Sequence, residues 1–171
     1  MGKKSTRENK NIYFKSREDA GLTRAQASEL MCAVSESRIE KMETGKTAIQ
    51  PEDVVEMASA YKKPELCNYY CTHECKIGKE NVQEVKVSSL TEIVVGLLSA
   101  LNSLNEQKER IIDISADGQI TDDELNDFIK IQNQLDNINM NVESLRLWLK
   151  TTIAEGKLDP EKLKELKKLK A

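Results

Sequence analysis

Residues 21–46 read GLTRAQASELMCAVSESRIEKMETGK, and this stretch carries the signals of two short helices joined by a turn. Thr23 and Gln26 have capping-box spacing, in which a hydroxyl caps the helix and the third residue reaches back to the cap, so a helix should begin here. Ser35 is a second favourable N-cap, which predicts another helix over 37–43 that ends at Gly45. The stretch therefore predicts two short helices that pack against each other across a turn.

Further short helices are predicted on both sides of this pair. A helix over 11–20 should end at Gly21, and a fourth helix should begin near Pro51, because proline fits the first turn of a helix. A fifth helix is expected from about Pro64 into a cysteine-rich stretch. We therefore expect residues 1–80 to form a compact domain of five helices.

Longer helices are predicted over residues 81–171. Apolar residues between 90 and 112 alternate spacings of four and three, the heptad pattern of a coiled-coil seam. After a turn at Asp117 and Gly118, a second long helix from Thr121 should complete an antiparallel hairpin, and a short helix over 161–170 follows. Since the apolar stripes are wider than one hairpin can bury, the excess packs either on the first domain or, as we favour, between chains in a dimer or higher oligomer. The predicted seam contains Leu90, Val94, Leu97, Leu101, Leu104 and Ile111, widened by Ile93, Leu98 and Ile112.

The composition agrees with an all-α fold. The 171 residues include 7 Gly, 3 Pro and 4% aromatic residues, too few for the turns and core of a many-stranded sheet. The formal net charge of -3 lacks the bulk basicity typical of nonspecific nucleic-acid binding. The charge divides unevenly, since residues 1–80 contain 14 Lys+Arg and 13 Asp+Glu, whereas residues 81–171 contain 12 and 16. The acidic excess therefore belongs to the predicted hairpin.

Nothing in the sequence predicts export or membrane insertion. The first ten residues are polar and basic with no apolar run behind them, and no stretch approaches the roughly 18 apolar residues of a membrane span. We therefore expect a cytoplasmic protein, whose four cysteines favour metal or redox chemistry over a disulfide framework.

The quoted stretch resembles the Cro/phage-repressor (XRE) helix-turn-helix family. The shared features are the GLT entry at residues 21–23, the VS pair at 34–35 and the E-x-GK ending at 43–46, within a resemblance that covers about residues 11–70. The chain has one extra residue at 31–33, where the family normally makes its turn with a single glycine. More loosely, the continuation through residues 66–71 into a helical tail resembles a group of Firmicutes XRE proteins.

The resemblance implies a λ-repressor-like fold and sequence-specific DNA binding by a dimeric transcription regulator. Its recognition helix would be residues 35–43, and the N-terminal arm with Lys3, Lys4, Arg7 and Lys10 could contact phosphates. The alternative is an adaptor that keeps the fold but binds protein, because the recognition helix also carries Glu36, Glu40 and Glu43. The residues expected to contact DNA are Arg24, Gln26, Ser35, Glu36, Ser37, Arg38, Lys41 and Lys46.

Three cysteines and the single histidine fall within nine residues. Cys67, Cys71, His73 and Cys75 could hold a zinc ion or an iron–sulfur cluster. The cysteine spacing also fits one buried helical face, which we favour, and redox-responsive thiols are a third interpretation. No cofactor is required by the pattern.

Residues 113–124 fit the twelve-position calcium loop of an EF-hand. The oxygen-bearing positions are Asp113, Ser115, Asp117, Gln119 and Glu124. The same residues also suit a turn and a capping box that begins the next helix, without any ion. No nucleophile–base arrangement and no phosphate-binding glycine pattern is present, so we do not expect an enzyme.

Overall fold

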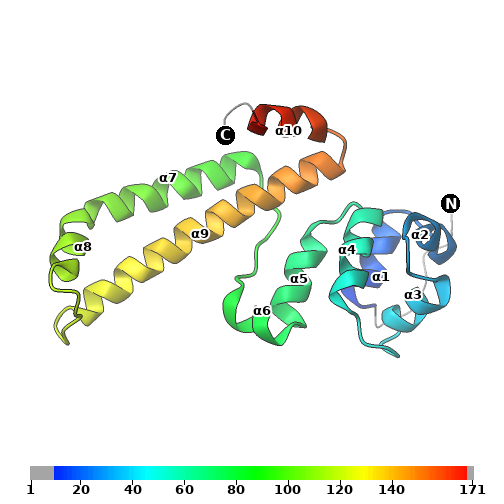
Figure 1. The fold of residues 1–171 in the computed structure, drawn as a ribbon, viewed down its shortest axis with the longest axis horizontal. Coiled ribbons are helices and arrows are strands. Elements are labelled where there is room, and N and C mark those ends of the chain that lie inside the picture. Colours follow the sequence, from blue (N-terminus) through cyan, green and yellow to red (C-terminus); the bar gives the residue numbers. More distant parts are fainter. Residues whose placement is uncertain (1–9, 169–171) are drawn as a thin grey trace. The chain divides into compact units, whose positions relative to one another are not determined.

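The structure is a computed structural model that describes residues 10–168 of the chain (Figure 1). The chain is 70% helical, and no strand occurs among the described residues, which confirms the all-α prediction. It divides into two compact units. Among the described residues, one unit contains residues 10–84 together with 149–168, and the other is Val85–Trp148. No helix in the described part is both long and apolar enough to cross a membrane.

The first unit begins with six short helices whose ends follow local sequence signals. The Thr23–Gln26 capping box and the Ser35 cap form as predicted, and Asn11 caps the first helix by accepting the Phe14 N–H at 2.9 Å. The sixth helix was not expected, because its N-cap is the Cys75 thiol, which accepts the Gly78 N–H at 3.4 Å. The five predicted helices are therefore present as α1 to α5, and α6 is an additional helix after them. The six helices are α1 (Ile12–Asp19), α2 (Arg24–Leu30), α3 (Glu36–Glu43), α4 (Pro51–Ala60), α5 (Glu65–His73) and α6 (Lys76–Asn81).

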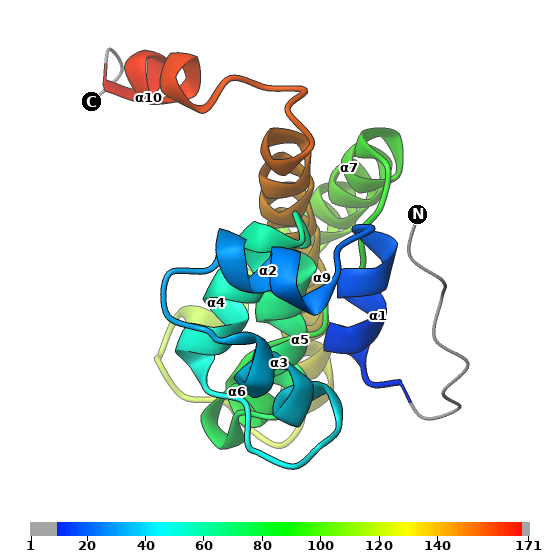
Figure 2. The ribbon, with the colours of Figure 1, turned by 90° about the vertical axis from the view of Figure 1, so that its right-hand side faces the viewer.

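The core of this unit draws on α1 to α5. Figure 2 shows α2 and α3 in front, on the side of the unit away from α5. Their inward residues meet large side chains of α1, α4 and α5 that are almost fully buried, such as Tyr13, Met57 and Leu66. The core is therefore closed on several sides, which fixes the position of α3. Its buried members are Tyr13, Ala27, Met31, Val34, Ile39, Met42, Val54, Met57, Ala58, Tyr61 and Leu66.

The second unit is built on α7 (Leu90–Glu106), α8 (Lys108–Ser115) and most of α9 (Leu125–Ala154). α7 lies beside α9 in both views (Figures 1 and 2), as the predicted hairpin requires. The single long helix expected before the turn is instead broken at Gln107, the residue between α7 and α8, where φ is -98° and ψ is 6°. After α9 the chain forms α10 (Pro160–Lys168). The bounds of α10 differ by one or two residues from those of the short helix predicted there.

The seam of the hairpin differs from the predicted one by a rotation of α7. Ile93 and Ala100 are buried, whereas Leu90, Val94 and Leu101 are 40–43% exposed. The heptad pattern therefore located the apolar stripe but not the edge of it that α9 covers.

Candidate nucleic-acid interface

α3 is amphipathic in the way the sequence predicts. Ile39 and Met42 are buried in the core, so the opposite side of the helix faces outward. Glu36, Ser37 and Lys41 are exposed on that outer side. α3 therefore presents a short polar surface on a helix that the core holds in place.

The turn between α2 and α3 is fixed at several points. Met31 and Val34 are buried, and the Ser28 hydroxyl donates to the Val34 carbonyl oxygen at 2.9 Å. The Cys32 N–H donates to the Glu56 carboxylate of α4 at 3.0 Å. The longer turn is therefore anchored to the core and to α4.

Arg38 is held by a carboxylate of α4. Its Nε donates to Oδ1 of Asp53 at 2.8 Å and its Nη2 to Oδ2 at 2.6 Å, a bidentate pair. The side chain of Asp53 is 7% exposed, while that of Arg38 is 37% exposed. Asp53 also accepts the Gln50 N–H at 2.9 Å, which caps α4. The position of the Arg38 side chain is therefore fixed by a buried carboxylate that is itself hydrogen-bonded to the start of α4.

The electrostatics of this pair follow from the same contacts. Burial alone would raise the pKa of Asp53, but the hydrogen bonds from Arg38 and Gln50, with the charge of Arg38, hold that pKa below its ordinary value. The hydrogen bond and charge of Asp53 raise the pKa of Arg38. Nη1 of Arg38 has no partner among residues 10–168. One edge of the guanidinium is therefore fixed, and the other points to no group of the described chain.

Glu43, at the end of α3, faces the interior. Its side chain is fully buried and accepts from Arg17 at 2.5 and 3.0 Å and from Nε of Arg24 at 2.8 Å. Arg24 is 27% exposed and lies within 3.8 Å of the Glu40 carboxylate as well. Glu43 therefore joins α1, α2 and α3 and does not face outward, so the sequence interpretation that counted it among the outward acids was wrong.

The residues predicted to contact DNA divide into two groups. Arg24 is ion-paired, Gln26 accepts the Thr23 N–H at 2.9 Å, Ser35 accepts the Arg38 N–H at 3.3 Å, and Arg38 itself is paired. The second group is exposed and has no side-chain partner among the described residues. It consists of Glu36, Ser37, Lys41 and Lys46.

The sequence did not predict the contacts that Asp53 and Glu56 of α4 make with α3 and with the turn before it. The capping-box pattern of Gln50 and Asp53 was a local signal for the role of Asp53 at the start of α4. Its pairing with Arg38, 15 residues away, had no such signal. The anchoring of the turn by Glu56 across 24 residues is equally non-local.

Comparison with known families identifies this region. A family model described as a helix-turn-helix domain matches residues 15–70. Residues 15–70 are a helix-turn-helix domain of the Cro/XRE-like type. In this domain α2 and α3 are the two helices that the turn joins. No curated protein and no solved structure gives a significant match to the chain.

The cysteine cluster lies at the end of the helix-turn-helix domain and just beyond it. Cys67 and Cys71 are on α5, and Cys75 caps α6. His73 stacks on Tyr69 at 4.2 Å between ring centroids. Burial raises the pKa of the Cys67 thiol, which disfavours the thiolate that metals bind. Within the described range no three His, Cys, Asp or Glu side chains form a group that could hold a metal ion, and the zinc or iron–sulfur site stays a prediction.

The calcium-loop residues take part in a turn and in helix ends. Asp113 and Ser115 belong to α8, and Asp117 accepts the Gln119 N–H at 3.0 Å. Glu124 accepts the N–H and the hydroxyl of Thr121 at 3.1 and 2.8 Å. These hydrogen bonds form the turn and the capping box that the sequence also predicts without an ion. A calcium site stays a prediction.

The proposed phosphate-binding arm precedes the helix-turn-helix domain. Lys3, Lys4 and Arg7 lie outside the described residues. Lys10 pairs with Glu18 at 2.7 Å and lies over the Phe14 ring, 5.0 Å from its centroid. Lys10 is therefore engaged within the domain.

Proposed function

We propose that the chain is a transcription regulator that binds a specific double-stranded DNA sequence through α3 and does so as a dimer or higher oligomer. A helix-turn-helix domain indicates a DNA-binding regulator in general terms. The exposed polar side of α3 has the chemistry to enter a major groove, and a dimer would contact two half-sites.

The presentation of Arg38 is the observation that carries this proposal. A guanidinium recognises guanine by donating two hydrogen bonds to O6 and N7. Asp53 binds the Nε–Nη2 edge of Arg38, so the Nη1 end remains available for a base. A side chain that is already fixed loses less conformational freedom on binding. We therefore assign base recognition to Arg38 and its orientation to Asp53.

The exposed lysines and Arg24 take different roles in this proposal. Lys41 and Lys46 are exposed and are suited to phosphate contacts, which position a protein on DNA without reading its sequence. Arg24 is occupied by Glu43, so we assign it to holding the domain together. Its substitution would weaken DNA binding through the fold.

Selection from a random DNA pool with the full chain tests the proposal. We expect one enriched sequence whose affinity falls steeply as salt rises. Arg38→Ala should weaken binding to it by about 5- to 150-fold and relax the preference at one base pair. Lys41→Ala should weaken binding to all sequences alike and reduce the salt slope by about one.

Lys79→Ala is the matched control, because Lys79 is an exposed lysine of the same unit on α6. It should leave both the affinity and the salt slope unchanged. A pool that yields no enriched sequence, with the fold verified by circular dichroism, would exclude the proposal.

One observation favours a second candidate, a protein-binding adaptor. Glu36 and Glu40 are exposed on α3, and the Glu40 side chain is 59% exposed. Carboxylates on this surface would oppose DNA phosphates, although a glutamate can accept a hydrogen bond from cytosine. An adaptor predicts no enriched DNA sequence and a partner protein whose binding is lost in Glu36→Lys.

A further inference from the structure

The outer side of α7 exposes a row of large apolar side chains. Val94, Val95, Leu98 and Leu101 are 42%, 62%, 56% and 43% exposed. No charged residue occurs from Ile93 to Asn105. A helix on the surface of a monomeric protein normally carries charged residues on its outer side. This row, which we call the α7 outer row, therefore has the character of an interaction surface that another element or chain covers.

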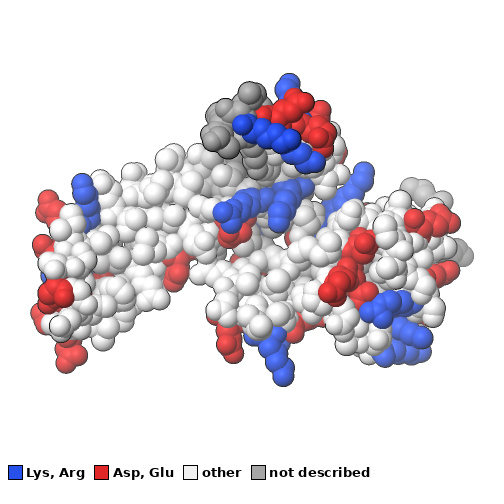
Figure 3. Space-filling model, in the orientation of Figure 1, with Lys and Arg blue, Asp and Glu red and all other residues white. Residues whose placement is uncertain are grey.

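The surface beside the α7 outer row has the same character. Residues 131–142 of α9 contain a single charge, Asp136, and expose Leu135 and Met140. Figure 3 shows the middle of this unit almost free of charged atoms, in contrast with the end formed by α8 and the start of α9. The apolar and uncharged area thus extends over both long helices.

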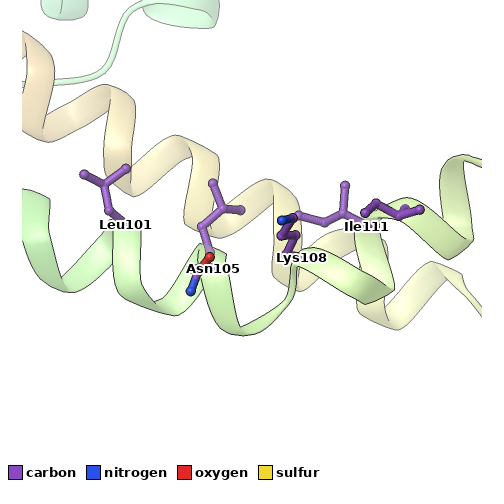
Figure 4. A pocket seen from close by; sticks show the side chains of 6 residues that line it. Leu101, Asn105, Lys108 and Ile111 are labelled. Carbon is purple, nitrogen blue, oxygen red and sulfur yellow. The ribbon is translucent and has the colours of Figure 1, made fainter.

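A groove continues the α7 outer row at the break between α7 and α8. It has a volume of about 410 Å³, and Figure 4 shows Leu101, Asn105, Lys108 and Ile111 along it. Leu104 and Ile112 complete its lining. The groove can receive a side chain of whatever covers the row.

We infer that a second copy of the chain covers the α7 outer row and that the two hairpins run antiparallel. This inference rests on the oligomer of the proposed function and specifies its surface and orientation. Residues 106–130, at the turn end of the hairpin, contain 8 Asp+Glu and 3 Lys+Arg. At the opposite end of the same continuous helix, residues 143–154 of α9 contain one acidic residue, Glu143, and two basic residues, Arg146 and Lys150.

The different charges of the two ends of the hairpin favour a second copy as the partner and an antiparallel orientation of the two hairpins. A parallel pair would bring two acidic ends together, whereas an antiparallel pair places each acidic end beside the basic end of the other copy. Acidic and basic ends on one hairpin are also self-complementary under a two-fold axis, as an interface between identical chains requires. The uncharged middle would then form the apolar centre of a four-helix bundle.

Oligomeric state tests the surface. Sedimentation of the full chain over a range of concentrations should show a dimer for the wild type and a monomer for Leu98→Glu, which places a charge in the centre of the α7 outer row. Ser99→Glu adds the same charge at an exposed polar position beside the row, one turn after Val95, and should weaken the dimer less than Leu98→Glu does. A wild-type monomer at all concentrations, or a Leu98→Glu variant that dimerises normally, overturns the inference.

Salt and charge removal test the orientation. In an antiparallel dimer, Asp122→Asn with Asp123→Asn removes attraction, so the dissociation constant should rise by about 3- to 10-fold, and it should also rise with salt. In a parallel dimer the same substitutions remove repulsion, and the constant should fall. An unchanged or tighter dimer overturns the antiparallel orientation.

The two proposals fail in different ways. Loss of sequence-specific DNA binding with the dimer intact would remove the proposed function and leave the interface. If Leu98→Glu instead behaves like the wild type in sedimentation while the DNA selection succeeds, only the interface is removed.

Discussion

The two units of this chain differ in what their helices bury. The helix-turn-helix domain has short helices, none of α1 to α5 longer than ten residues, yet most of its large apolar side chains close into one core. The hairpin has helices of 17 and 30 residues, yet exposes most of its large apolar side chains. The length of its helices therefore does not show whether a unit is stable by itself, because a helix is stabilised mainly through the apolar face that other elements cover.

The polar contacts show the same difference. The helix-turn-helix domain buries Arg17, Glu43 and Asp53, each with hydrogen-bonded partners. In the hairpin the ion pair between Arg110 and Asp127 has both side chains more than a third exposed. Buried pairs impose one arrangement on their surroundings, whereas exposed pairs contribute little to stability. We therefore expect the domain to respond strongly to point substitutions and the hairpin to respond to protein concentration.

The largest expected effect comes from removing the buried carboxylate of the domain. Glu43→Ala leaves Arg17 without its buried partner and should lower the free energy of unfolding by about 3–5 kcal/mol. All four tyrosines lie in the first unit and the only tryptophan, Trp148, in the second, so tryptophan fluorescence reports on the second unit and the tyrosine bands of near-ultraviolet dichroism report on the first. The tyrosine signal should move to lower urea and the Trp148 signal should not.

Glu40→Ala is the control for this measurement, because Glu40 is a largely exposed glutamate on the same helix. It should change the free energy of unfolding by less than about 0.5 kcal/mol. Equal effects of the two substitutions would mean that burial of Glu43 has no energetic importance.

A pair of glycines compares the packing of the two units directly. A Cβ atom at Gly78 would collide with the backbone carbonyl of Cys71, whereas one at Gly96 would lie 2.5 Å from Oδ1 of Asn141, the end of a side chain that can rotate. Gly78→Ala should therefore cost about 1–3 kcal/mol. Gly96→Ala should be near neutral, since alanine gains about 1 kcal/mol of helix propensity over glycine.

Urea unfolding followed by the same two signals measures both substitutions. A cost at Gly96 as large as that at Gly78 would show that the hairpin is as tightly packed as the first unit. That result would contradict the inference that the first unit is more tightly packed than the hairpin.

The sequence predicted those features of the domain that depend on neighbouring residues. Thr23, Gln26 and Ser35 set the starts of α2 and α3, and these caps act over three residues. α6 was missed because a cysteine thiol is an unusual cap, and the break at Gln107 was missed because no proline or glycine marks it. Local signals therefore located the motif but not every helix boundary.

The candidate site could be predicted only in part for a related reason. The alternation of apolar and polar residues in α3 indicated which side faces outward. It could not show that Arg38 meets Asp53 or that Glu43 turns inward to Arg17, because these partners are 15 and 26 residues apart. In α7 the same limit applies, since the periodicity does not say which edge of a wide stripe α9 covers.

The smallest expected effect concerns the end of α4. Lys62 has φ of 57°, a left-handed conformation that favours glycine, and the Lys63 N–H donates to the Ala58 carbonyl oxygen at 2.9 Å as in a Schellman motif. Lys62→Gly should relieve this strain and add about 0.5–1 kcal/mol to the stability of the domain. The tyrosine-monitored melting temperature should rise by about 2–8 °C while the Trp148 transition stays in place.

Gly45 is the matched reversal, because it occupies the same position after α3 with φ of 70° and the Lys46 N–H donates to the Lys41 carbonyl oxygen at 2.8 Å. Gly45→Lys should lower the domain's melting temperature by a similar amount, since a side chain there must adopt the left-handed conformation. Opposite signs at these two positions, with Trp148 unaffected by both, would show that the domain unfolds independently of the hairpin. If both substitutions shift the Trp148 transition as well, the two units unfold together and the hairpin draws stability from the domain.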